Sequence, residues 1–396
     1  MRSRSVVAVT TTLALGCGVA AVAMGPSATG AAGSLQQAEL VGRTVLPADT
    51  FGEQLPSGAL ANAANGRTTP FPAQPVQGFS GVLPQADGTY WVLSDNGFGT
   101  KANSADFILR VQHVKPDYAT GKATVVDLGV DLEDPDRKVP FPLARADRRL
   151  TGADFDLESF RQAPDGTLWF GDEFGPWLLH TDANGKVLEA PFHVPGVASP
   201  SDPTLPAGAT PNLANSKGFE GMALSEDGKE LYPMLEGPVV GDSPQDLRVY
   251  KFNLRHTRFQ GIAFRYRLES AGNAIGDLTA VDDHRYVVLE RDNGEGASAR
   301  FKAVFLVDDR DKDKDGYADK TLLVNLMAVP DPNGIAGPKG SFFTFPFQTI
   351  EGIAVLDDHT LLIENDNNYP GSAGRTPGSP DDNEFIKVRL DRSLTD

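Results

Sequence analysis

Acidic and amide side chains recur at two positions of a segment that appears five times in the chain. The copies start at Phe79, Leu157, Phe219, Gly276 and Ile350. The first position, at the start of each copy, is acidic in four of the five and holds Ser80, Glu158, Glu220, Asp277 and Glu351. The second begins 13 to 16 residues later and holds Asp95, Asn96, Asp172, Glu173, Glu236, Glu290, Asp292, Asn293, Glu364, Asp366, Asn367 and Asn368. Two short strands and a tight turn would return the chain to its starting face, so we expect both positions on one face.

A ring of carboxylates is the arrangement that these positions predict. So many like charges share one face only with raised pKa values or with bound cations. Oxygen ligands, without Cys and with few His, favour a hard ion such as Ca²⁺. The predicted metal ligands are Glu158, Asp172, Glu173, Glu220, Glu236, Asp277, Glu290, Asp292, Glu351 and Asp366. Turn formation by Asp and Asn is the alternative, but it explains the acids at strand ends better than those at strand starts.

Two basic residues lie beside these acids in the sequence. Lys217 shortly precedes Glu220, and Arg291 lies between Glu290 and Asp292. Cations in so acidic a patch either pair with the carboxylates, which is the more common outcome, or hold a phosphate oxygen beside calcium. The sequence leaves both roles open.

The segment DRDKDKDGYADK is a second candidate cation-binding site. Asp311, Asp313 and Asp315 alternate before Gly316, and Asp319 follows. This spacing matches the first half of an EF-hand-type loop, although its twelfth position is Leu322 instead of Glu. The loop is expected to join two strands, either around a structural Ca²⁺ or as a solvated turn.

The sequence gives little evidence for catalysis by a serine nucleophile. No G-x-S-x-G motif occurs, and Ser80 is more simply a small residue that eases strand packing. His284 and His359 occupy equivalent hairpin turns, which we expect on the face opposite the acids. A Ser-His-Asp arrangement is therefore not favoured.

The elements that must position the acids are hairpins. Each copy alternates with a period close to two around an Asp-Gly or Asp-Asp turn, and a second strand pair follows each of the first four copies. Four strands per unit predict an all-β propeller blade. We expect five blades, with six as the alternative. The lone strand in residues 38–49 would close the ring by pairing with the last blade, whose outer strand is otherwise missing.

The N-terminal segment and the net charge predict where the protein acts and what it does not bind. Residues 1–32, with Arg2 and Arg4 before an apolar run, have the layout of a secretory signal peptide, and a membrane anchor or a lipoprotein signal at Cys17 are the alternatives. Residues 33–396 then form a single domain without cysteine. The formal net charge of −17 argues against nucleic acid or an anionic membrane as a partner. We expect a secreted monomer that acts on a small molecule.

The motifs KGFEGMALSEDG, LERDNG, IEGIAV and ENDNN, with GFSGV and SDNG near the start, resemble the family called esterase-like activity of phytase. The resemblance covers residues 78–390. It implies a β-propeller, dependence on calcium and hydrolysis of phosphate or other esters. It also implies catalytic roles for Glu220, Glu290 and Glu351, with Lys217 and Arg291 as phosphate contacts. Few basic side chains accompany them, which argues against phytate itself.

Three functional hypotheses follow. The first is a secreted calcium-dependent hydrolase of phosphate esters, in which an ion-activated water attacks the phosphoryl group. The second is a metal-dependent lactonase or carboxyl-ester hydrolase. The third is a non-catalytic extracellular propeller that calcium stabilises and that binds other molecules at its rim.

Overall fold

The predicted hairpins are present, and they form the centre of the molecule. A computed structural model describes residues 38–52 and 55–396, so the expected leader lies outside the described residues. The first and second strands of the five copies pair antiparallel. They are β2 (Phe79–Pro84) and β3 (Tyr90–Ser94), β6 (Leu157–Gln162) and β7 (Leu168–Asp172), β10 (Phe219–Leu224) and β11 (Glu230–Leu235), β14 (Ala274–Ala280) and β15 (Arg285–Arg291), and β20 (Thr349–Asp357) and β21 (Thr360–Asp366).

One turn chemistry is common to all five hairpins. The first aspartate of each turn accepts a hydrogen bond at Oδ1 from the backbone N–H two residues later. These aspartates are Asp87, Asp165, Asp227, Asp282 and Asp357. The side chain thereby satisfies a backbone donor that the ladder cannot reach, which is why Asp favours this position.

Outer strands extend four of these hairpins into four-stranded sheets, in the orders β2-β3-β4-β5, β6-β7-β8-β9, β10-β11-β12-β13 and β14-β15-β16-β17. The outer strands are β4 (Arg110–Asp117), β5 (Lys122–Asp131), β8 (Trp177–Thr181), β9 (Phe192–His193), β12 (Asp246–Asn253), β13 (Arg258–Arg267), β16 (Lys302–Asp308) and β17 (Asp319–Asn325). A separate two-stranded sheet pairs β18 (Val329–Asp331) with β19 (Ser341–Phe343). A 3₁₀ turn, η1 (Gly296–Ser298), is the one helical element among residues 38–52 and 55–396.

The strand at the start of the described chain completes the last sheet. β1 (Ala38–Leu46) pairs antiparallel with β22 (Asn383–Leu390), from Ala38 opposite Leu390 to Leu46 opposite Asn383. β22 pairs in turn with β21. A single parallel bridge between Val45 and Lys122 joins β1 to β5, so the first and last sheets form one eight-stranded sheet. The backbone edge that β22 would otherwise expose is therefore covered, as expected from the sequence.

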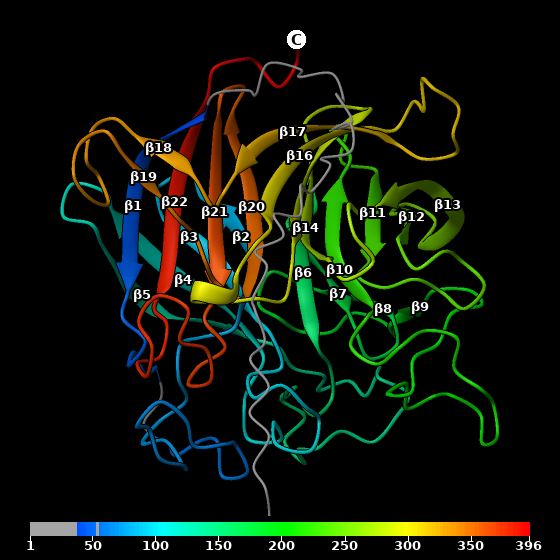
Figure 1. Cartoon of the computed structure of the whole chain (residues 1–396). Coiled ribbons are helices and arrows are strands. Elements are labelled where there is room, and N and C mark those ends of the chain that lie inside the picture. Colours follow the sequence, from blue (N-terminus) through cyan, green and yellow to red (C-terminus); the bar gives the residue numbers. More distant parts are fainter. Residues whose placement is uncertain (1–37, 53–54) are drawn as a thin grey trace, which may run out of the picture. The chain divides into compact units, whose positions relative to one another are not determined.

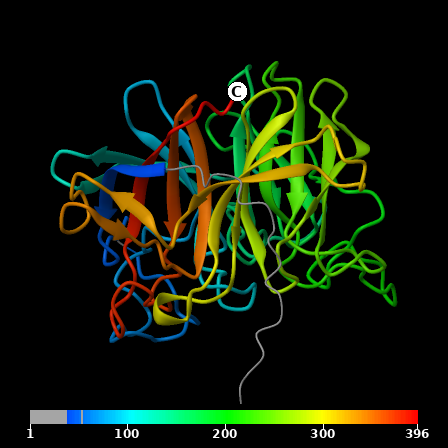
Figure 2. The same ribbon diagram turned by 45° about the horizontal axis from the view of Figure 1, so that its top comes forward.

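The first strands of the five hairpins lie side by side around a centre (Figure 1). β2 contacts β6, β6 contacts β10, β10 contacts β14, β14 contacts β20, and β20 contacts β2. Figure 2 shows the same sheets from nearer their upper ends, radiating from these strands. Apolar clusters fill the spaces between neighbouring sheets, for example Leu93 of β3 with Phe160 of β6 and Phe170 of β7. The described chain is therefore all-β and propeller-like.

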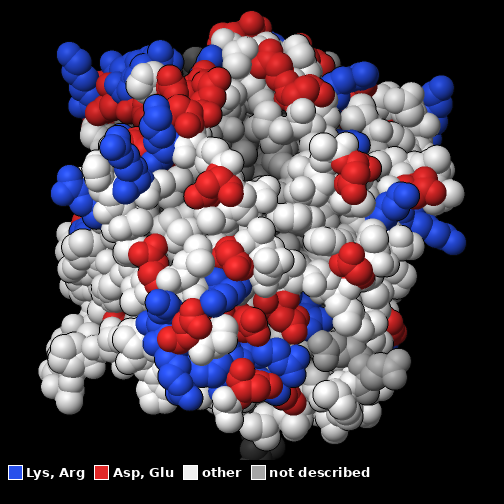
Figure 3. Space-filling view, turned by 180° about the vertical axis from the view of Figure 1, so that it is seen from behind, with Lys and Arg blue, Asp and Glu red and all other residues white. Residues whose placement is uncertain are grey.

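Surface charge on the side seen from behind is mixed. Basic and acidic side chains alternate there, and no broad region carries basic residues alone (Figure 3). The segment between β5 and β6 forms ion pairs of its own, with Arg145 on Asp147 at 2.6 Å and Arg149 on Asp131 of β5 at 3.4 Å. In the described part of the chain, no helix is long and apolar enough to cross a membrane.

Candidate active site

Six of the predicted acids meet at one end of the inner strands. Together with both predicted basic residues, they line a cavity of about 230 Å³. These eight residues are Glu158, Glu173, Lys217, Glu220, Glu236, Arg291, Glu351 and Asp366. The remaining lining is Asp95, Asn96, Gly99, Asp156, Ser216, Asn293, Gln348, Thr349 and Asn368. The expectation that both repeat positions share one face is thus confirmed for these acids.

A local irregularity occurs at or next to the first repeat position in every hairpin. The pairing register shifts between Leu157 and Ser159, between Phe219 and Gly221, and in the equivalent parts of β2 and β20. In β14 the shift skips Gly276, and Asp277 stays paired with Leu289. A bulge of this kind bends the strand and redirects the side chain that it frees. Glu158 and Glu220 are the residues skipped by these shifts, and both line the cavity.

Glycines next to the bulges let the inner strands approach closely. A Cβ atom on Gly221 would lie 2.8 Å from the Leu278 nitrogen, and one on Gly276 would lie 1.9 Å from the Ile350 carbonyl oxygen. Only glycine tolerates such an approach. The narrow ring that results brings carboxylates from different sheets into one cavity.

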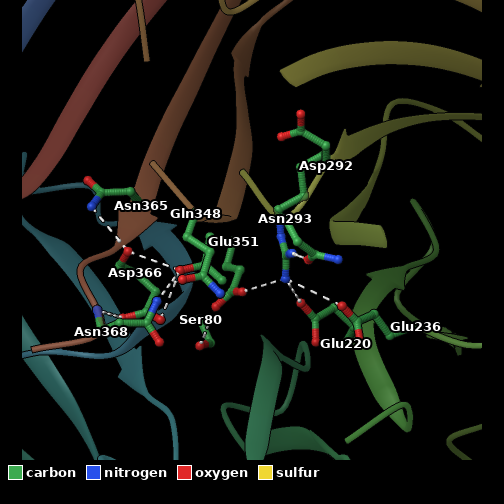
Figure 4. A network of polar contacts seen from close by, with 12 residues as sticks. Ser80, Glu220, Glu236, Asp292, Asn293, Gln348, Glu351, Asn365, Asp366 and Asn368 are labelled. Atoms are coloured by element: carbon green, nitrogen blue, oxygen red, sulfur yellow. Dashed lines mark hydrogen bonds and ion pairs between the residues drawn. The ribbon is translucent and has the colours of Figure 1, made fainter. Parts of the chain in front are cut away.

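Arg291 is the centre of the cavity's charge network. Its Nη2 lies 3.1 Å from Glu351, 3.3 Å from Glu236 and 3.7 Å from Glu220. Figure 4 shows these three carboxylates converging on one point from different strands. Burial opposes the charge of the guanidinium, but the carboxylates outweigh burial and raise the pKa of Arg291. Arg291 therefore pairs with carboxylates, which is one of the two roles that the sequence left open for it.

The carboxylates outnumber the basic groups that neutralise them. Lys217 forms an ion pair with Glu236, and no third Lys or Arg lines the cavity among the described residues. Burial raises the pKa of Glu158, Glu173 and Glu220 well above the ordinary range, and neighbouring carboxylates raise it further. Burial likewise raises the pKa of Glu351 to about 8 and that of Asp366 to about 6.

The donor set fits a hard divalent cation. Carboxylate oxygens of Glu173, Glu220 and Glu236 all lie within 4.8 Å of one another, as do those of Asp156, Glu158 and Glu173. Oε1 of Glu173 is buried without a hydrogen-bond partner, and Oε1 of Glu220 has none besides its ion pair with Arg291 at 3.7 Å. An orphaned buried carboxylate oxygen is costly, and a cation would satisfy it. The lining offers oxygen ligands and, among the described residues, neither His nor Cys.

Glu290 was predicted to be catalytic, and the structure corrects this. Its carboxylate accepts hydrogen bonds from the Tyr266 hydroxyl at 2.7 Å and the Asn273 amide at 2.8 Å, and it pairs with Lys320 at 3.1 Å. Successive side chains on a strand point to opposite faces, so Glu290 faces away while Arg291 faces the cavity. Glu290 therefore anchors neighbouring strands.

Three other predicted metal ligands have structural partners instead. Asp172 accepts backbone hydrogen bonds from Asp156 at 2.9 Å and Gly175 at 2.8 Å. Asp277 pairs with Arg161 at 3.0 Å. Asp292 pairs with Lys302 at 3.0 Å, accepts three backbone hydrogen bonds, and is drawn apart from the converging carboxylates in Figure 4. None of the three lines the cavity.

Asp156 is a cavity acid that lies outside the repeat pattern. It lies two residues before Glu158, and the other four copies have no acid at the equivalent place, so the repeat gave no signal. The Asn96 amide donates to Asp156 at 2.6 Å. Asp95 appeared in the repeat but not among the predicted ligands. Its carboxylate joins the cavity, and burial raises its pKa.

The structure places Ser80 against a cavity acid and both hairpin histidines in turns away from the cavity. Ser80 is fully buried and donates to Glu351 at 3.1 Å. His284 lies in the turn between β14 and β15 and contacts Asp309 at 2.9 Å, and His359 lies in the turn between β20 and β21. Neither histidine lines the cavity.

The predicted second loop joins two strands, β16 and β17, as expected. Oxygens of Asp311, Asp313 and Asp315 lie within 4.8 Å of one another. Arg267 pairs with Asp315 at 3.0 Å and neutralises part of this charge. Asp319 accepts the backbone N–H of Lys312 at 3.0 Å and does not belong to the group of three.

Residues 74–369 match the family model called phytase-like, described as esterase-like activity of phytase. The chain is also similar to an uncharacterized secreted protein of Arthroderma benhamiae, with 27% identity over 113 residues that cover 24% of this chain and 22% of that protein. The chain thus matches about a fifth of that relative's length.

Two solved structures resemble the chain at low sequence identity. One is a protein of unknown function from Dyadobacter fermentans, with 10% identity, a TM-score of 0.42, and coverage of 89% of this chain and 99% of that one. Another is the PQQ-bound aldose sugar dehydrogenase of Streptomyces coelicolor, with 12% identity, a TM-score of 0.35, and coverage of 88% and 98%. The fold assignment rests on the strand pairings described above.

Proposed function

Because the chain belongs to the phytase-like family described as esterase-like activity of phytase, we propose that it is a secreted, calcium-dependent hydrolase of phosphate esters. The proposal includes a five-bladed propeller closed by β1. The observation that carries it is the cavity in which carboxylate oxygens of Glu173, Glu220 and Glu236 lie within 4.8 Å of one another. Oε1 of Glu173 is buried there without a hydrogen-bond partner, and Arg291 pairs with Glu220 and Glu236.

Glu173, Glu220 and Glu236 would hold the cation, and Asp156 and Glu158 extend the ligand set. When bound, the ion supplies positive charge that polarises a phosphoryl oxygen and acidifies a water. All five side chains are at least 90% buried, so their oxygens are fixed and partly shielded from solvent. Two neighbouring groups of three carboxylates therefore form a preorganised anionic cradle.

The remaining cavity residues would act on the ester itself. Arg291 and Lys217 orient the phosphoryl oxygens, because their carboxylate partners are the groups that a cation would engage. Glu351 accepts the proton of the attacking water. A bond forms between phosphorus and the water oxygen, the bond to the ester oxygen breaks, and the departing alcohol takes up the proton that Glu351 received from the water. Ser80 and Arg291 hold Glu351 in position.

Glu220→Gln tests the proposal. Removing this charge, with little change in shape, should lower kcat/KM for a phosphomonoester by about 100-fold, as expected for loss of one electrostatic group in a buried site. Glu226→Gln is the matched control, since Glu226 is exposed in the turn between β10 and β11 and lies outside the cavity, and this change should alter kcat/KM by less than about twofold. Unchanged turnover in Glu220→Gln, with circular dichroism showing an intact fold, would contradict the proposal.

A lactone or carboxylic ester is the second candidate substrate class. The observation that favours it is that both cavity cations already pair with carboxylates, which leaves little free positive charge for a phosphate dianion. Parallel assays with p-nitrophenyl phosphate, p-nitrophenyl acetate and a lactone panel separate the classes. Turnover of none of them, with calcium still raising the melting temperature, would support a non-catalytic binding propeller instead.

A further inference from the structure

A second cavity of about 260 Å³ adjoins the acidic one. The loop at residues 61–64, the segment after β3 and the segment after β21 enclose it. Both cavities share four lining residues, Asp95, Gly99, Gln348 and Asn368. A molecule whose reacting group occupies the acidic cavity can therefore extend directly into this side cavity.

The side cavity repels negative charge. No Lys or Arg is among the described residues that line it, while Asp95 and Glu295 contribute carboxylates. The two cations of the acidic cavity are already paired with Glu236 and Glu351. An additional phosphate on the substrate would find no positive partner in either cavity, and such like-charge contacts are unfavourable.

The polar lining suits hydroxyl groups. Asn62, Gln348 and Asn368 contribute amide side chains, which both donate and accept hydrogen bonds, and Phe98 contributes an aromatic surface. Apolar walls with a few amides that fix orientation are typical of small-molecule sites. The volume lies just below the roughly 300 to 1,000 Å³ of sites for drug-sized ligands, so the occupant is small.

The walls are also held in place before any ligand binds. Phe98 packs edge-on against Phe107 at 5.3 Å, and Tyr369 packs against Phe71 at 5.2 Å. Gln77 ties the two segments together, since its amide donates to the Gly97 carbonyl at 2.5 Å and its carbonyl accepts the Tyr369 N–H at 3.1 Å. A preformed site loses less free energy on binding than a mobile one.

We propose that the side cavity binds the alcohol part of the substrate, and that this alcohol is an uncharged polyhydroxyl group of monosaccharide size. The preferred substrate is then a sugar monophosphate, not a polyphosphorylated compound. The reaction rests on the proposed function, whereas binding of the free sugar does not.

Asn62→Trp tests the side cavity. Asn62 is exposed, has no hydrogen bond among those described and lines the cavity, so a bulky ring there should fill the space without breaking the fold. Ala63→Trp is the matched control, because Ala63 is also exposed but does not line the cavity. We expect Asn62→Trp to raise KM for glucose 1-phosphate at least about tenfold, which corresponds to about 1.4 kcal/mol. Ala63→Trp and wild type should have the same KM for glucose 1-phosphate and should hydrolyse ethyl phosphate at the same rate.

A binding measurement separates this inference from the proposed reaction. Saturation-transfer NMR with a panel of free hexoses should give signals for the wild-type chain and for Ala63→Trp, and weak signals for Asn62→Trp. Equal signals for both variants, or none for wild type, would overturn the side-cavity proposal even if esters are hydrolysed. Faster hydrolysis of phytate than of glucose 1-phosphate would also overturn it. Hexose binding without hydrolysis of any ester would support the side cavity while contradicting the proposed reaction.

Discussion

At the scale of single residues, the site is defined by a guanidinium that is surrounded by more negative charge than it can neutralise. Arg291 contacts three buried carboxylates, and Lys217 is the second cation among the described residues that line the cavity. A buried ion pair often contributes little net stability, but removing one partner is costly because the other charge is left uncompensated. Arg291 is therefore both a proposed substrate contact and a structural necessity in the absence of a cation.

Arg291→Met should lower the free energy of unfolding by about 3 to 5 kcal/mol when divalent cations are removed. Calcium should restore part of this loss, because the ion takes over the neutralising role. Urea denaturation with chelator and with calcium measures both effects. Lys229→Met, at a highly exposed pair with Asp227, serves as the control and should cause no measurable change. Equal stability of Arg291→Met and wild type in chelator would contradict this account.

At the scale of elements, hairpins determine where the acids lie, and buried contacts behind the hairpins hold them there. Lys302 of β16 is a contact of this kind. Its fully buried ammonium pairs with Asp292 at 3.0 Å and donates to the carbonyls of Asp292 at 2.7 Å and Gln348 at 3.1 Å. It thus links the end of β15 to the segment before β20.

Lys302 should make stability depend on pH. Burial lowers its pKa to about 8 from 10.5, although Asp292 acts in the opposite direction. Between these values the unfolded chain binds more protons than the folded chain, so stability rises with pH in this window. Lys302→Met should remove a rise of up to about 3 kcal/mol between pH 8 and 10.5. Urea denaturation of both proteins at several pH values measures the difference, and parallel profiles would show that the lysine keeps its ordinary pKa.

At the scale of the whole molecule, the ring of strands concentrates charge that the sequence spreads over the chain. The formal net charge is −17, and seven Asp and Glu side chains from the repeat gather in one cavity: Asp95, Glu158, Glu173, Glu220, Glu236, Glu351 and Asp366. A cation that binds only the folded ring stabilises it by mass action. Folding and ion binding should therefore be coupled.

Removal of divalent cations should lower the melting temperature, and calcium should restore it in a saturable manner. At a calcium concentration about 100 times Kd, the gain should be about 2.7 kcal/mol. Differential scanning calorimetry across a calcium titration tests this, with sodium chloride at matched ionic strength as the control for screening. A shift that sodium chloride reproduces would mean that the effect is general screening and not binding.

The sequence by itself determined the strand hairpins and the placement of most cavity acids. Period-two alternation and Asp turns are local signals, and the Asx hydrogen bond in all five turns shows why they are reliable. The first repeat position correctly predicted that Glu158, Glu220 and Glu351 line the cavity, because a bulge frees the side chain at this position in β6, β10 and β20. Pairing of β1 with β22 was also foreseen, because an unpaired edge needs a partner.

Only the tertiary structure decided which acids line the cavity and which are neutralised by structural partners. Glu290 and Arg291 are adjacent in β15, and their side chains point to opposite faces of the strand. A shift of the strand register by one residue would therefore exchange the residue that anchors neighbouring strands and the residue that lies in the cavity. Asp277 is neutralised by Arg161, 116 residues away in the sequence. The side cavity joins residues 61–64 to residues 368–372. Partners so distant in sequence leave no local pattern, because contact between them depends on how the sheets pack around the ring.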